Sequence, residues 1–167
     1  VFGAPEEPAR RIPYSVADRG ARRQSPVVEA FLQLLALPDS RLGAATVLEL
    51  LDPPVLRERF EITTADLEWI RRWVEETNIR WGADAAHQTA LELPATPGNT
   101  WRDGIDRLLL GYAMRGDDSL TFADILPHAD IEGDAAEVLG RFAQWLSEIF
   151  ALVRELTEPR SLSAWAD

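Results

Sequence analysis

Lysine is absent from this sequence, because all 17 of its basic residues are arginine. A P-loop uses its lysine to reach the β- and γ-phosphates of a nucleotide, so a complete Walker A site is excluded. Cysteine is also absent, which excludes disulfides, thiolate nucleophiles and cysteine-based zinc sites and favours a cytoplasmic protein. The longest apolar runs fall far short of the length that spans a bilayer, so we expect a soluble protein with no membrane partner.

Histidine is scarce, with two in the whole chain. Asp84 and His87 stand three residues apart and would share one face of a helix, but a tetrahedral metal site needs a third protein ligand. The acidic residues between His128 and Asp134 resemble a calcium loop, yet Arg141 stands where such a loop requires a bidentate glutamate. We therefore predict polar loops in both places, and we identify no catalytic, cofactor-binding or metal-ligating set.

The net charge of −11 is spread unevenly along the chain. Residues 1–25 hold five arginines against three acidic residues, whereas the remainder holds 12 arginines against 25 acidic residues. An acidic surface repels the phosphate backbone of a nucleic acid, so the amino-terminal arm is the better candidate for a DNA contact. The residues predicted to make it are Arg11, Tyr14, Arg19, Arg22 and Arg23.

The first half of the chain shows helical periodicity interrupted by prolines. Ser25 followed by Pro26 is a typical helix start, and apolar residues then recur at helical spacing until Pro38, namely Val28, Phe31, Leu32 and Leu35. We predict two further short helices, over residues 44–51 and from Asp52-Pro53-Pro54 through Phe60.

Two capping patterns predict the next helices. Thr63 with Asp66 resembles a capping box, and the helix it opens carries one apolar face with two tryptophans beside it, formed by Leu67, Ile70, Val74 and Thr77 with Trp69 and Trp73. Residues 78–99 are expected to be irregular. Thr100 with Asp103 repeats the capping pattern, and the helix that follows is apolar nearly all round, which favours the buried centre of a bundle.

The last helix has the most regular period. Its apolar residues alternate at intervals of four and three, as Ala135, Leu139, Phe142, Leu146, Ile149, Val153 and Leu156, before Pro159 ends the run. We expect residues 115–133 to form an acidic loop with one helical turn. The predicted fold is therefore all-α, a bundle of six or seven helices, with at most one vestigial strand near Ile12-Pro13-Tyr14.

Six tryptophans are the remaining unusual feature. Exposed tryptophan beside arginine can stack on bases in single-strand channels. Four of the six stand on apolar stripes and are predicted to be core residues, namely Trp69, Trp73, Trp101 and Trp145. Trp81, in the Arg80-Trp81-Gly82 turn, is open to three interpretations: it fills a groove, anchors a partner chain or packs beneath the loop.

Two sequence strings carry a family resemblance. The first is Asn78-Ile79-Arg80-Trp81-Gly82, and the second runs from Asn99-Thr100-Trp101-Arg102 to Leu108-Leu109-Leu110-Gly111-Tyr112-Ala113-Met114. Together they resemble the RecC family, the gamma subunit of exodeoxyribonuclease V (RecBCD). The stretch from Arg11 to Arg19 also looks like the point where superfamily 1 helicases enter their inserted helical 2B domain.

This resemblance implies an internal fragment with three parts: residues 1–24 connect from a RecA-like domain, 25–160 form a helical 2B-like domain, and 161–167 begin a truncated segment. The start Val1-Phe2-Gly3, without initiator methionine or leader, agrees with an excised piece. The implied role is a non-catalytic scaffold of an inactive helicase-like subunit in double-strand break repair and recombination. The scaffold would help to shape the DNA channels and subunit interfaces.

In this reading, RecB-like and RecD-like partners perform ATP hydrolysis and strand cutting. A RecB-type nuclease centre uses a lysine beside its metal ligands, which this chain cannot supply. Two alternatives remain open. One is the 2B-type domain of another superfamily 1 helicase-like protein, such as an AddB relative, and the other is an unrelated acidic helical adaptor.

Overall fold

The computed structural model describes residues 25–96, 98–114, 121–128, 131–159 and 161. Its elements are α2 (Pro26–Ala36), the 3-10 helix η1 (Leu37–Asp39), α3 (Ala44–Glu49), α4 (Pro54–Arg59), α5 (Asp66–Glu76), α6 (Ala85–Ala90), α7 (Trp101–Ala113) and α8 (Asp134–Thr157). The predicted all-α class is confirmed. The β pairing within these ranges is a single isolated bridge between Phe122 and Ile125. The strand expected near Ile12-Pro13-Tyr14 lies outside the described residues.

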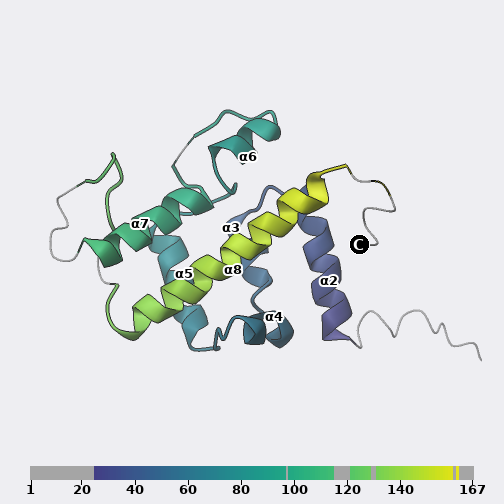
Figure 1. The fold of residues 1–167 in the computed structure, drawn as a ribbon, viewed down its shortest axis with the longest axis horizontal. Helices are drawn as coiled ribbons and strands as arrows, with labels where there is room; N and C mark the ends of the chain where they lie inside the picture. The colour runs from purple at the N-terminus through teal and green to yellow at the C-terminus, as the bar shows by residue number, and fades with distance from the viewer. Residues whose placement is uncertain (1–24, 97, 115–120, 129–130, 160, 162–167) are drawn as a thin grey trace, which may run out of the picture.

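The long helix α8 forms the centre of the fold. Its 24 residues span about 36 Å, and it runs diagonally across the molecule in Figure 1, in contact with α5, α7 and η1. The apolar stripe predicted for it is confirmed. Its buried residues are Ala135, Val138, Leu139, Phe142, Trp145, Leu146, Ile149 and Val153.

Helix α7 does not have the central place that its composition predicted. Leu109 and Tyr112 are 41% and 45% exposed, and the buried residues of the helix are Trp101, Gly104 and Leu108. The apolar stripe of α8 is longer and occupies the centre of the fold. One side of α7 therefore packs on the core, and its other side is exposed to solvent.

Aromatic rings fill the middle of the core. Trp101 lies 6.3 Å from both Phe142 and Phe150, measured between ring centroids, and Phe142 stacks on Trp145 at 5.9 Å. Burial of Trp73, Trp101 and Trp145 is confirmed.

The prediction for Trp69 was wrong, because its side chain is 38% exposed. The Arg72 guanidinium lies over its ring, 4.2 Å from the centroid. A planar cation of this kind covers an aromatic face that the core does not. Trp69 therefore belongs to the surface of α5.

The predicted capping bonds are formed. Ser25 caps α2, its hydroxyl accepting from the Val28 N–H at 3.5 Å. Thr63 and Asp66 bond reciprocally: the Thr63 N–H donates to Asp66 Oδ2 at 2.8 Å, and the Asp66 N–H donates to Thr63 Oγ1 at 3.2 Å. Helix α5 itself begins at Asp66, so the two bonds close the turn that leads into it.

One loop prediction needs correction. Residues 78–99 contain the short helix α6, which begins where the Asp84 carboxylate accepts from the His87 N–H at 2.8 Å. Within the acidic segment 115–133, the described residues contain a tight turn between Phe122 and Ile125, and residues 115–120 and 129–130 lie outside the described part. Positive φ angles at Ala123 and Asp124 fit a turn that joins two extended residues.

Candidate functional site

The predicted DNA-contact residues belong to the amino-terminal arm. Arg11, Tyr14, Arg19, Arg22 and Arg23 all belong to residues 1–24, which lie outside the described residues. The same holds for Asp130 in the acidic loop.

Residues 78–82 and 99–102, from the two strings that carried the family resemblance, meet residues 41–44 in a junction of three chain segments, 41–44, 78–83 and 99–102, which we call the three-segment junction. Main-chain hydrogen bonds join all three. They run from the Gly82 N–H to Arg41 O (2.9 Å), Ala44 N–H to Arg80 O (2.9 Å), Arg80 N–H to Asn99 O (2.8 Å), Trp101 N–H to Gly82 O (3.0 Å) and Arg102 N–H to Ala83 O (2.9 Å).

Side chains complete this junction. The Trp101 indole N–H donates to the carbonyl oxygen of Leu42 at 2.8 Å, and Asn78 Nδ2 donates to Asn99 Oδ1 at 2.7 Å. Asn78, Asn99 and Gly82 have φ angles of 57°, 64° and 84°, in the left-handed region that asparagine and glycine adopt most readily. The left-handed backbone conformation at these three positions therefore explains why asparagine or glycine stands there.

Gly104 lets α7 approach the junction closely. A Cβ at this position would overlap the side chain of Ile79 and come within 3.1 Å of Thr77 Oγ1. Both neighbours are buried, so they have little room to move. A side chain larger than hydrogen would push α7 away from residues 77–79.

A second polar corner joins α5, α7 and the loop before α8. Arg107 donates from Nη1 to Thr77 O at 3.0 Å and from Nε to Leu126 O at 3.2 Å. The His128 N–H donates to Arg107 O at 2.9 Å, and its ring Nε2 lies 3.1 Å from Glu76 Oε2. His128, considered earlier as part of a calcium loop, is thus engaged in holding the loop against α5.

Asp84 and His87 are brought together, but as a helix cap. Asp84 uses its carboxylate on the main chain of His87, as described above. Burial of the imidazole lowers the pKa of His87 from its ordinary value of 6.5, and the Asp84 charge opposes this shift. Across the described ranges, no group of three or more histidine, aspartate or glutamate side chains is placed to hold a metal ion.

Comparison with known proteins identifies the family. The sequence model described as "RecBCD enzyme subunit RecC fourth domain" matches residues 24–167. The chain belongs to the RecC family. It is 46% identical over 166 residues to the RecBCD enzyme subunit RecC of Escherichia coli K12, covering 99% of this chain and 14% of that protein.

RecC proteins of two other bacteria match this chain at lower identity. The subunit of Mycobacterium tuberculosis H37Rv is 34% identical over 160 residues, which cover 96% of this chain and 15% of that protein. The subunit of Haemophilus influenzae is 33% identical over the full 167 residues, which cover 14% of its length. The chain therefore spans about one seventh of the length of these RecC relatives.

The RecC-like strings thus have a structural role in this chain. Trp81 is half-buried within the three-segment junction, beside the main-chain bonds of Arg80 and Gly82. The order of residues along the chain did not indicate that the two strings would meet. Asparagine at two left-handed turns was the available signal, because asparagine is enriched at such positions.

A surface that the sequence did not predict lies on α2. Five large apolar side chains on this helix are exposed, and we call them the α2 outer face: Val27 (59%), Val28 (42%), Phe31 (57%), Leu32 (37%) and Leu35 (42%). Their helical spacing correctly predicted the helix, but periodicity does not reveal which face packs inward. No helix in the described part of the chain is both long and apolar enough to cross a membrane.

Proposed function

We propose that this chain is one domain of a longer RecC subunit and acts as a non-catalytic scaffold in a helicase–nuclease of the RecBCD type. The observation that carries the proposal is the three-segment junction, because residues from both RecC-like strings, such as Gly82 and Trp101, are engaged there in main-chain and core contacts. The relatives are named as RecBCD enzyme subunits, and this chain matches one seventh of their length. RecB-like and RecD-like subunits are the proposed partners, and they would perform ATP hydrolysis and strand cutting.

A scaffold acts by holding other parts in position. A change in its core should therefore alter how much complex assembles, while each assembled complex keeps its catalytic rate. The test introduces Gly104→Ala into the RecC subunit that contains this domain, because the added Cβ overlaps Ile79. Gly140→Ala is the matched control, since a Cβ there meets nothing within 4 Å.

The complex is reconstituted with its partner subunits, and assembly is measured by size-exclusion chromatography alongside DNA unwinding and degradation. We expect Gly104→Ala to reduce the yield of complex, with unchanged rates per assembled complex, and Gly140→Ala to change neither. A normal yield with strongly reduced rates per complex would contradict the scaffold role and indicate direct participation in the chemistry.

We propose further that any DNA contact made by this domain lies in its amino-terminal arm. The charge distribution supports this proposal, since residues 1–25 carry about +2 and the remainder about −13. The test is fluorescence anisotropy with a labelled forked DNA at low and moderate salt, using Arg19→Ala, Arg22→Ala and Arg23→Ala together. A matched triple variant, Arg59→Ala, Arg71→Ala and Arg154→Ala, removes three exposed charges elsewhere.

We expect weak, salt-sensitive binding that the arm variant loses and the control variant retains. Equal loss in both variants would mean that binding follows net charge alone. Binding that survives in the arm variant would remove the arm from the DNA path.

A further inference from the structure

The apolar surface of helix α2 is wider than the side that packs on the core. Its inner side places Ala30, which is 2% exposed, and the partly buried Leu34 against the core. The α2 outer face continues from this inner side, while Glu29 and Gln33 form the polar side of the helix. A helix normally buries the whole of its apolar stripe, so an uncovered part of it is unusual. At 11 residues, or about 16 Å, the helix is too short to enter a bilayer as a span.

An acidic groove lies along one edge of α2. It is a cavity of about 460 Å³ lined by Pro26, Glu29, Gln33, Glu49, Asp52 and Pro53. Glu29 and Glu49 are exposed and form no ion pair with another described residue, while Asp52 pairs with Arg71 at 3.2 Å. Glu29 stands three residues before Leu32 on the helix, so these carboxylates border the α2 outer face directly.

Gln33 adds a hydrogen-bonding requirement to this groove. Its side-chain Oε1 is buried and has no hydrogen-bond partner among the described residues. The α2 outer face is thus bordered by the carboxylates of Glu29 and Glu49 and by the side chain of Gln33.

We propose that the α2 outer face is covered by a basic amphipathic helix from another segment of the same, longer polypeptide. Its apolar residues, at intervals of three and four, would pack on Phe31, Leu32 and Leu35. Arginine or lysine along one edge would meet Glu29 and Glu49, as expected for an apolar interface centre bordered by complementary charge. This inference rests on the proposed function, because it requires the chain to be part of a RecC subunit.

Two observations favour a segment of the same polypeptide. The E. coli relative has about six sevenths of its length outside the matched region, so ample chain exists to supply a helix. An uncovered patch of five large apolar residues also favours aggregation. A helix of the same polypeptide stays at high effective concentration beside the patch because it is covalently attached.

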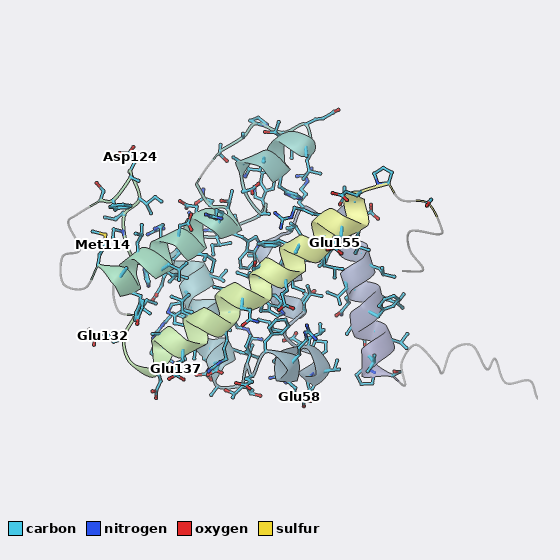
Figure 2. All side chains as sticks on the ribbon, in the orientation of Figure 1. Glu58, Met114, Asp124, Glu132, Glu137 and Glu155 are labelled. Carbon is cyan, nitrogen blue, oxygen red and sulfur yellow. The ribbon has the colours of Figure 1, made fainter. Side chains whose placement is uncertain are left out.

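The test replaces Phe31 with the photoreactive p-benzoylphenylalanine in the full-length RecC polypeptide, assembled with its partner subunits. Phe31 is 57% exposed, so the substitution is compatible with folding. The control replaces Glu137, an exposed residue near the amino-terminal end of α8, which lies far from α2 in Figure 2. After irradiation, mass spectrometry identifies the cross-linked peptide.

We expect Phe31 to cross-link to a basic, helical peptide of the same polypeptide outside the present 167 residues, and Glu137 to give a different product. Cross-linking of Phe31 to another subunit, to a second copy, to residues 1–24 or to nothing would overturn the inference. Copurification of the partner subunits is a separate readout. If they fail to copurify, the proposed function is wrong, whereas an assembled complex without the expected cross-link contradicts this inference alone.

Charge reversal tests the acidic edge. Glu29→Arg with Glu49→Arg should lower the yield of the Phe31 cross-link several-fold, because both substitutions place positive charge opposite the basic edge of the occupant. Both residues are exposed, so the double variant should fold. Glu75→Arg, at an exposed position on α5, is the control and should leave the yield unchanged. An unchanged yield in the double variant would overturn the charge assignment.

Discussion

The indole N–H of Trp101 donates to the main-chain oxygen of Leu42 over 2.8 Å, although 59 positions separate the two residues. Trp101 is fully buried and Leu42 is 1% exposed. The same tryptophan reaches Phe142 and Phe150 of α8 with its ring. One side chain therefore joins the three-segment junction to the central helix.

Trp101→Phe should destabilise the domain by about 2–4 kcal/mol, because it leaves the Leu42 oxygen buried without a donor and removes part of a packed ring. The measurement is urea unfolding followed by far-ultraviolet circular dichroism, which does not depend on tryptophan emission. Trp69→Phe is the matched control. Its ring is partly exposed and contacts Arg72, so the expected loss is about 1 kcal/mol or less. Equal losses would show that the hydrogen bond to Leu42 contributes little.

Gly104→Ala should lower the free energy of unfolding by about 1–3 kcal/mol, since the new methyl group overlaps Ile79 in a packed core. The result is diagnostic because the same change normally favours a helix. Gly140→Ala on α8 has open space around it and should raise stability by about 0.5–1 kcal/mol. The two variants should thus shift the urea midpoint in opposite directions. A shift of Gly104→Ala in the stabilising direction would contradict the close approach of α7.

Short-range patterns predicted much of this fold. The reciprocal bonds of Thr63 and Asp66 and the stripe of α8 depend on residues within one or two helical turns, so the sequence indicates them directly. α6 was missed because its residues, AAHQTA, include no large apolar side chain, whereas the equally short α3 and α4 contain valine and leucine. Its start was marked only by Asp84, which is also typical of loops.

Burial was harder to predict than helicity. Leu109 on α7 and Phe31 on α2 both belong to helices with apolar residues on several sides, and composition does not say which side faces the core. Which side of a helix is buried depends on which helix occupies the centre of the fold, and here that helix is α8. The meeting of Asn78 with Asn99 was likewise hidden, because it requires two turns that are distant in the sequence. The predicted DNA-contact arginines remain a prediction.

Arg107→Lys should destabilise the corner between α5 and α7 by about 1–3 kcal/mol. The guanidinium reaches Thr77 O and Leu126 O with two different nitrogens, and a lysine ammonium cannot reproduce this fork. Hydrogen exchange should accelerate at the His128 amide, which bonds to Arg107 O. Arg102→Lys is the control on the same helix, because its exposed pair with Asp106 is expected to contribute about 0.5 kcal/mol or less. Unchanged exchange at His128 in Arg107→Lys would contradict the role of the fork.

His87 should make the domain less stable as the pH falls. Burial of its ring lowers the pKa in the folded state below the ordinary 6.5, so the unfolded chain binds the proton more readily. Stability from the neutral ring is therefore complete above about pH 6.5 and is lost progressively as the pH falls toward the lowered folded value. Urea unfolding at pH 7.5 and 5.5 should show a larger loss for the unchanged chain than for His87→Gln, which cannot titrate. Between pH 7.5 and 8.5 the two should change in parallel, because an imidazole is neutral in both states there. Equal losses between pH 7.5 and 5.5 would assign the acid sensitivity to the carboxylates instead.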